Sequence, residues 1–392
     1  MIIKSLLLSK VGTSLAKRND MKRIFISLNI FALILLLLYV MISVAVFMNN
    51  VSVPTIAVNT VPDKYDSVLN AIDAEIQTLD LYLDGLTLRS QHLTKNSSQL
   101  IFPAEVQDMT RTAAIAKGWC TPRLGADLQV LVMVLNRVDD FQRRATLRHT
   151  WAQDFQSPNR SKLYFAVGLS RDETVQRRLV AEDLMHHDII QWSYYESYYN
   201  CSIKSLAILR WTATNCPLVK YVLKADDDSL IRSDKLIDFV RQTPGADTIY
   251  GHMWTKPGVF RTGNKWSINT SDYTDDYYPD YIGGPWLIPG PKVMVLYSTA
   301  ILKSLPALPF EDAYITGIVA SKANVNRESM PGIMYLDYRS NCDIERLDLC
   351  WYDRYSIFWQ GINDSSMTLF YNRITRFDAK SCTKFSFHYL YN

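Results

Sequence analysis

The 392-residue sequence lacks the features that define several common protein classes. It has no long run of Lys or Arg, and its 42 basic and 39 acidic residues leave a formal net charge of +3, so the charge pattern does not indicate nucleic-acid binding. It contains no GxxxxGKS or GxxxxGKT segment, which argues against a P-loop phosphotransferase. Its six Cys show no CxxC metal spacing, and no internal repeat or low-complexity stretch occurs. The length permits a large enzyme domain with a buried core.

Residues 24–48 contain no Asp, Glu, Lys, Arg or His. A helix of this length is about 37 Å long and exceeds the roughly 30 Å of a bilayer's hydrocarbon core. Basic residues dominate the segment before it, and the first charge after it is Asp63, so the positive-inside rule predicts a cytosolic N-terminus. The alternative is a cleaved signal peptide, whose apolar region is usually shorter. We therefore expect a cytosolic tail at 1–23 and an uncleaved transmembrane signal-anchor at 24–48.

This topology places everything after residue 49 in the secretory lumen, where disulfides form and Asn can be glycosylated. The even number of Cys agrees with that expectation, although their pairing cannot be read from the sequence. Six sequons predict a glycoprotein, at Asn50, Asn96, Asn159, Asn200, Asn269 and Asn363.

The luminal part divides by its pattern into a stem at 49–124 and a domain at 125–392. The stem has one regular feature, a series of apolar residues with alternating gaps of three and four, formed by Leu69, Ile72, Ile76, Leu79, Leu83 and Leu86. This pattern predicts a short coiled coil that would form a homodimer, or else an amphipathic helix packed on its own domain. From 125 onward, apolar runs alternate with helical stretches, which predicts an α/β domain with a mainly parallel sheet.

An acidic triplet, Asp226 to Asp228, directly follows one of these apolar runs. Ligands of parallel α/β sheets collect at the carboxyl ends of strands. Three adjacent carboxylates repel one another unless a cation compensates, and oxygen ligands suit Mg²⁺ or Mn²⁺. The alternative is an acidic turn that caps the next helix.

Two further groups of charged residues allow both a functional and a structural interpretation. Arg144 and Arg148 are four residues apart and would share a helix face, where they would bind a diphosphate or form ordinary surface. The adjacent Glu311 and Asp312 would provide a general base or the acidic start of a helix.

Five segments resemble, in the same order, motifs of the β-1,3-galactosyltransferase and β-1,3-N-acetylglucosaminyltransferase family, which are Fringe-related inverting enzymes with a GT-A fold. They are RRATLRHTW at 143–151, ESYYNCSIKS at 196–205, VLKADDDSLIR at 222–232, YYPDYIGGPWLIPG at 277–290 and FEDAYITG at 310–317. The chain departs from the family pattern at Glu196 and Cys201, and at Pro285 and Trp286, where the family has Gly and Tyr. The last two departures make the acceptor side the least transferable part of the resemblance.

The resemblance implies a Rossmann-like mixed sheet flanked by helices and a role for each matching residue. Asp226 and Asp228 would flank Mn²⁺, or Mg²⁺, and the donor diphosphate, with Asp228 as the direct ligand. Asp227 would contact the donor sugar. Asp312 would be the catalytic base, with Glu311 orienting it.

The resemblance also implies positions for the remaining matching residues. Arg144, Arg148 and Lys224 would lie in the nucleotide-binding region, although Arg148 and Lys224 also suit structural roles. In this fold a late His often completes the metal shell, and His388 is the candidate, with an ordinary packed or surface His as the alternative.

The implied function is inverting transfer of galactose or N-acetylhexosamine from a UDP-sugar to a hydroxyl of a glycan, glycoprotein or glycolipid, with formation of a β-1,3 linkage. The implied location is the Golgi membrane, as a single-pass type II protein with a luminal catalytic domain. The alternative is an inactive Golgi relative that binds glycans or stabilises a partner.

Overall fold

The structure is a computed structural model that describes residues 109–110, 115, 117–118, 120–156, 160–243, 247–335, 348–378 and 382. The predicted signal-anchor at 24–48, the apolar heptad series at 69–86 and His388 lie outside these residues. Among the described residues, no helix combines the length and the apolar character needed to cross a membrane. The chain forms two compact units, Met1–Glu75 and Ile76–Asn392, and all that follows concerns the second.

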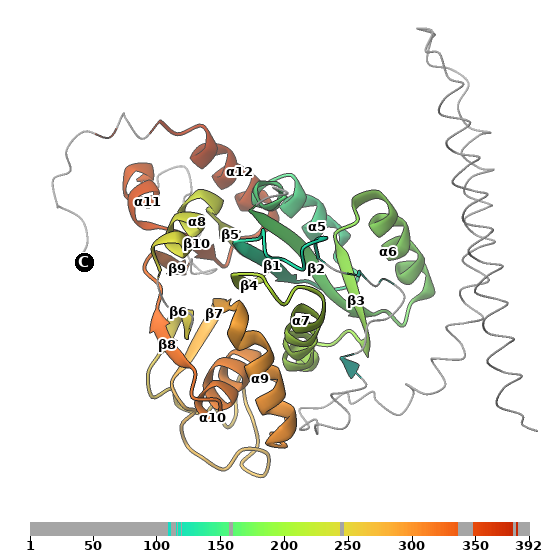
Figure 1. The fold of residues 1–392 in the computed structure, drawn as a ribbon, viewed down its shortest axis with the longest axis vertical. Helices are drawn as coiled ribbons and strands as arrows, with labels where there is room; N and C mark the ends of the chain where they lie inside the picture. Colours follow the sequence, from blue (N-terminus) through green and yellow to red (C-terminus); the bar gives the residue numbers. More distant parts are fainter. Residues whose placement is uncertain are drawn as a thin grey trace, which may run out of the picture. The chain divides into compact units, whose positions relative to one another are not determined.

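A seven-stranded mixed sheet lies at the centre of this unit, in the order β3-β2-β1-β4-β7-β6-β8 (Figure 1). Its strands are β1 (Val130–Leu135), β2 (Ser161–Leu169), β3 (Ile189–Tyr195), β4 (Tyr221–Asp226), β6 (Thr248–Trp254), β7 (Tyr281–Pro289) and β8 (Asn326–Ser329). Strands β3, β2, β1 and β4 are parallel, whereas β7 is antiparallel to both β4 and β6. The predicted α/β architecture is confirmed, and the mixed half of the sheet begins at β7.

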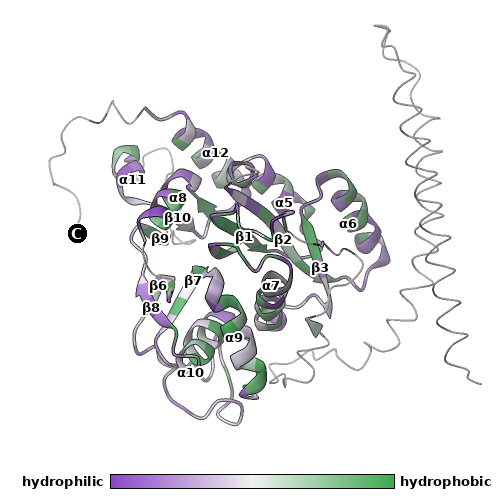
Figure 2. Cartoon of the chain, in the orientation of Figure 1, coloured by the Kyte–Doolittle hydropathy of each residue, from purple (hydrophilic) through white to green (hydrophobic). Residues whose placement is uncertain are grey.

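The apolar runs form strands because both faces of the sheet are covered. In β1, Leu131, Met133 and Leu135 belong to one core cluster, while Val130, Val132 and Val134 belong to the other. This division follows from side chains that alternate between the two faces of a strand. Figure 2 shows the resulting contrast between hydrophobic central strands and the more hydrophilic helix α6.

Helices cover both faces. They are α5 (Phe141–Arg148), α6 (Glu173–His186), α7 (Cys201–Asn215), α8 (Ser233–Gln242), α9 (Gly290–Leu302) and α10 (Ala320–Lys322), with short 3₁₀ segments η2 (Trp151–Phe155) and η3 (Tyr198–Asn200) and the π-helical η4 (Asp312–Val319). Helices α7 and α9 and segment η4 contribute to the first core cluster, and α5, α6 and α8 contribute to the second.

The C-terminal part of the chain joins the acidic triplet through a second, three-stranded sheet in the order β5-β10-β9. These strands are β5 (Ser229–Ile231), β10 (Phe358–Gln360) and β9 (Ile333–Tyr335). In sequence, α11 (Leu349–Tyr355) precedes β10 and α12 (Asp364–Thr375) follows it. Gln360 lies opposite Ser229, and the amides of Gly361 and Ile362 donate to the carbonyl of Asp228. The late part of the chain therefore belongs to the site region.

Two disulfides pair four of the six Cys, Cys120 with Cys216 and Cys350 with Cys382. Cys120 is buried in the first core cluster, as is Met109, so the chain packs on the sheet before residue 125. The Cys201 thiol is free.

The described sequons differ in accessibility. The side chain of Asn200 is buried and donates to the carbonyl of Tyr195, which leaves no room for a glycan in the folded chain. Asn269 and Asn363 are exposed.

Candidate active site

A cavity of about 820 Å³ opens at the carboxyl ends of the parallel strands. Its walls come from the segments that follow β1, β2, β3 and β4, and include 135–139, 169–172, 195–198, Asp226 and Asp227. The predicted position of the acidic triplet at the end of a strand is confirmed, since β4 ends at Asp226. Of the triplet, Asp226 and Asp227 line this cavity.

Lys224 connects the acidic triplet to the second acidic pair. Its side chain is fully buried, and its Nζ lies 2.7 Å from Asp226 Oδ1, 2.9 Å from Glu311 Oε1 and 3.7 Å from Asp312 Oδ1. Burial alone would lower the pKa of Lys224, but these three carboxylates raise it well above its ordinary value. A permanent ammonium therefore holds carboxylates from two distant segments together.

Asp312 lies at the start of η4 with its side chain 30% exposed. The indole Nε1 of Trp286 donates to its Oδ1 at 2.7 Å, and the backbone N–H of Gly284 donates to its Oδ2 at 3.1 Å. Burial, opposed by the Lys224 ammonium and reinforced by the carboxylates of Glu311 and Asp226, raises the pKa of Asp312 to about 7. A carboxyl group with this pKa can accept a proton and release it near neutral pH.

The strand register explains why Trp286 meets Asp312. Trp286 lies opposite Lys224 in the β4–β7 pair and is fully buried, and the Lys224 ammonium is 5.6 Å from its ring centroid. Because Trp286 stands where the family has Tyr, an indole N–H donates to the candidate base, Asp312.

A side chain at position 284 would displace the Asp226 carboxylate. A Cβ there would lie 2.8 Å from Asp226 Oδ2 and 3.2 Å from Lys224 Nζ. The peptide that joins it to Pro285 is cis. The backbone of β7 therefore approaches the carboxylates closely enough for its N–H to bind Asp312.

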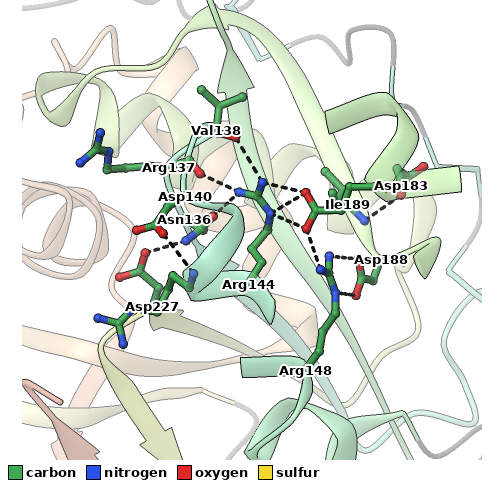
Figure 3. A network of polar contacts seen from close by, with 12 residues as sticks. Asn136, Arg137, Val138, Asp140, Arg144, Arg148, Asp183, Asp188, Ile189 and Asp227 are labelled. Atoms are coloured by element: carbon green, nitrogen blue, oxygen red, sulfur yellow. Dashed lines mark hydrogen bonds and ion pairs between the residues drawn. The ribbon is translucent and has the colours of Figure 1, made fainter. Parts of the chain in front are cut away.

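Asp227 points toward the end of β1, where Asn136 Nδ2 donates to its Oδ2 at 2.7 Å (Figure 3). Burial raises the pKa of Asp227 to about 6, with a further contribution from Asp228. Asn136 is itself held from two sides, because Lys204 donates to its carbonyl and Arg144 donates to its Oδ1. The amide is thus fixed in the orientation that presents its NH₂ group to Asp227.

Arg144 cannot bind a donor diphosphate in this geometry, which corrects the expectation from the sequence. Its side chain is fully buried, and its guanidinium donates to Glu182, Asn136 and the carbonyls of Arg137 and Val138 (Figure 3). All five N–H groups of the guanidinium are used in these bonds. Arg144 therefore acts through Asn136 and supports the cavity wall.

Arg148 lies one helical turn further along α5 and also has acidic partners. It donates to Asp188 through Nε and Nη2, both at 2.8 Å, and to Glu182 at 2.6 Å. Burial opposes the charge, but these bonds raise the pKa of Arg148 above its ordinary value. Arg148 thus has a structural role in this geometry, because its side chain anchors α5 to α6 and to the start of β3.

The two departures in ESYYNCSIKS lie on the cavity wall. Glu196 accepts from Lys204 at 2.7 Å and from the backbone N–H of Gly168 at 2.8 Å. Its side chain therefore connects β2, the end of β3 and α7. Cys201 also lines the cavity, and burial raises the pKa of its thiol, which stays protonated.

In the described ranges, no three or more His, Cys, Asp and Glu side chains are grouped to hold an ion. However, Gln360 Nε2 donates to Asp226 Oδ2 at 3.1 Å, and its Oε1 is a buried acceptor with no hydrogen-bond partner among the described residues. The carboxylates of Asp226 and Asp228, together with the amide oxygen of Gln360, are a donor set that suits Mg²⁺ or Mn²⁺.

Three side chains in this site were missed from the sequence. Asn136 directly follows an apolar run in the sequence, as the acidic triplet does, and the same signal could have identified it. Trp286 is visible in the sequence only as a departure from the family pattern, which does not indicate a hydrogen bond to Asp312. Gln360 is 134 residues from its partner Asp226, and no local pattern marks it.

Comparison with known proteins agrees with the ordered segments. Residues 142–331 match a family model described as galactosyltransferase. The chain is 28% identical over 213 residues to a lactosylceramide 1,3-N-acetyl-β-D-glucosaminyltransferase A of Danio rerio, a match that covers 51% of this chain and 56% of that protein. It is 26% identical over 260 residues to a human acetylgalactosaminyl-O-glycosyl-glycoprotein β-1,3-N-acetylglucosaminyltransferase, covering 62% of this chain and 66% of that one. The matched part thus spans between half and two thirds of these relatives.

The match of residues 142–331 indicates the glycosyltransferase class. Within it, the matched segment is similar to β-1,3-galactosyltransferases and β-1,3-N-acetylglucosaminyltransferases. The structure of mouse xyloside xylosyltransferase 1 overlaps 61% of this chain and 99% of that one at 10% identity and a TM-score of 0.31, too low a score to refine the assignment.

Proposed function

We propose that this protein transfers a hexose, galactose or N-acetylhexosamine, from a UDP-sugar to a hydroxyl of a glycan, glycoprotein or glycolipid, with inversion and formation of a β-1,3 linkage. The observation that carries the proposal is the Asp312 carboxyl group, whose pKa of about 7 suits a base and which a buried lysine links to the acidic end of β4. The names of the relatives support the linkage.

In the proposed reaction, Asp312 accepts the proton of the acceptor hydroxyl while that oxygen attacks the anomeric carbon. The bond from this carbon to the diphosphate oxygen breaks with its electron pair going to UDP, so one displacement inverts the configuration. Trp286 and Gly284 hold the two oxygens of Asp312 through N–H bonds, which fixes the direction of the carboxylate. Glu311 shares Lys224 with the base and thereby stabilises its position.

The cavity beside Asp226 and Asp227 is the proposed donor site. Its volume of about 820 Å³ is of the size that ligand pockets have. Asp227, held by Asn136, would accept hydroxyls of the donor sugar. Lys224 binds no nucleotide in this scheme, because its ammonium is buried among three carboxylates.

Asp226, Asp228 and Gln360 would hold Mn²⁺, or Mg²⁺, next to the donor. When bound, the cation would offset the negative charge that develops on the departing diphosphate. A contribution from His388 remains a prediction from the sequence.

The location and the assembly of the protein are proposed from its sequence alone. Residues 24–48 would anchor the protein in the Golgi membrane with its catalytic domain in the lumen. The heptad series at 69–86 would join two copies.

The test is transfer by the full-length protein in detergent, with Mn²⁺, a set of UDP-sugars and a broad acceptor panel. We expect turnover with at least one donor, a β-linked product by NMR, and a loss of about 10²-fold or more in Asp312→Asn. The exposed Asp275→Asn is the matched control and should retain wild-type turnover. Wild-type turnover no higher than that of Asp312→Asn with every donor would refute the proposal.

A further inference from the structure

Exposed aromatic side chains gather next to the donor cavity, on two segments far apart in the sequence. Tyr198, in η3, lines the cavity and is 46% exposed. Trp266, in the connection between β6 and β7, is 48% exposed. Large aromatic side chains exposed together mark a binding surface more often than ordinary surface.

Lys265 joins these two aromatic residues. Its Nζ lies 5.5 Å from the ring centroid of Tyr198 and 4.7 Å from that of Trp266. The Trp266 side chain also lies near the Tyr198 hydroxyl, whose pKa it lowers. The connection between β6 and β7 is therefore attached to the cavity wall at this point.

Tyr198 lies near the acidic segments of the site. Burial and the carboxylates of Glu311 and Asp226 raise the pKa of Tyr198, so its hydroxyl lies within the field of both acidic segments. Cys201, three residues further along, is affected by Glu311 in the same way. A molecule resting on Tyr198 and Trp266 would thus lie at the donor cavity, close to the acidic segments of Glu311 and Asp226.

The chemistry of this surface suits a sugar ring. The faces of Tyr and Trp rings carry partial negative charge, which attracts the C–H groups on the apolar face of a pyranose. The Lys265 ammonium provides three N–H donors for sugar hydroxyls at the edge of that face.

We propose that Tyr198, Lys265 and Trp266 form the subsite for the acceptor's terminal pyranose. The two aromatic rings pack against the sugar's apolar face, and Lys265 donates to its hydroxyls. This inference rests on the proposed function and assigns residues that decide which acceptor is used.

The experiment measures acceptor binding separately from turnover. Saturation-transfer NMR is recorded on the full-length protein in detergent with UDP and Mn²⁺, using methyl β-galactoside and methyl β-N-acetylglucosaminide as probes. We expect transfer to at least one probe with the wild type, and a roughly tenfold weaker affinity in Trp266→Ala and Tyr198→Ala. Tyr198→Phe, which keeps the ring, should lose much less of its affinity for the probe. Tyr355→Ala on α11, whose side chain is 49% exposed, is the matched control and should bind as the wild type does.

Donor hydrolysis distinguishes this inference from the proposed function. Release of UDP from the donor to water needs no acceptor, so Trp266→Ala should keep the wild-type hydrolysis rate and donor KM while its acceptor KM rises. Unchanged acceptor affinity in both alanine variants, or an equal rise in donor and acceptor KM, would overturn the subsite. Absence of all transfer and hydrolysis in the wild type would instead count against the proposed function, while NMR would still decide the subsite.

Discussion

The carboxyl group of Asp312 lies among groups that act on its pKa in opposite directions. Burial and the neighbouring carboxylates favour the protonated form, whereas Lys224 and the indole N–H of Trp286 favour the ionised form. The balance gives a pKa of about 7, so a small change in any partner alters the fraction of ionised base at neutral pH.

Trp286→Phe tests this balance. Because the hydrogen bond to Asp312 favours the carboxylate, removing it raises the pKa of Asp312 further, and a base must be ionised to act. We expect the acidic limb of the pH profile of kcat/KM to move upward by roughly one pH unit. The measurement is kcat/KM between pH 5.5 and 9.

Trp151→Phe is the matched control for that profile, because Trp151 is also fully buried but its Nε1 has no hydrogen-bond partner among the described residues. Its acidic limb should stay at the wild-type position. A Trp286→Phe profile that superimposes on the wild type would contradict the role given to the indole.

At the scale of elements, local patterns predicted the strands but not the partners of their residues. The apolar run at 221–225 predicted β4, and the position of Asp226 at its end followed from strand geometry. The spacing of Arg144 and Arg148 correctly indicated a shared helix face. It could not show that this face meets Glu182, which is 38 residues from Arg144 and comes from α6.

The C-terminal segment shows the same limit more strongly. Strand β10 has three residues, too few for a periodic pattern, and it gains its place by pairing with β5 directly after the acidic triplet. That pairing places Gln360 against Asp226. The late segment thus supplies an amide to the candidate metal site, in the part of the chain where a His was expected.

Gln360→Leu tests whether this amide takes part in metal binding. Loss of its oxygen should weaken Mn²⁺ binding to the UDP complex by about tenfold, since an ion of this kind has few protein ligands. Gln360→Glu, which replaces the amide oxygen with a carboxylate, should bind at least as tightly as the wild type. Free Mn²⁺ is measured by electron paramagnetic resonance, a readout independent of turnover.

The exposed Gln242→Leu, at the end of α8, is the matched control and should leave Mn²⁺ affinity unchanged. Equal affinities for the wild type and Gln360→Leu would remove Gln360 from the ligand set without affecting the role of Asp312.

At the scale of the whole molecule, the packed unit is closed by contacts between segments that are distant in sequence. Gln191 N donates to the carbonyl of Ile115, and the Trp211 indole donates to the carbonyl of Lys117. The Cys120–Cys216 disulfide adds a covalent link across 96 residues. The segment before β1 therefore supports α7, whose first residues lie on the cavity wall.

Removing this disulfide should destabilise the unit and, through α7, the donor site. A link that closes a long loop limits the freedom of the unfolded chain, and its loss costs about 3 kcal/mol. For a domain of this size, we expect the Tm of Cys120→Ser/Cys216→Ser to fall by roughly 5–10 °C. Cys201→Ser is the control, because that thiol is free, and its Tm should change little. Both Tm values are measured by thermal unfolding in non-reducing buffer, followed by tryptophan fluorescence. A double variant as stable as Cys201→Ser would show that noncovalent packing alone holds the upstream segment on α7.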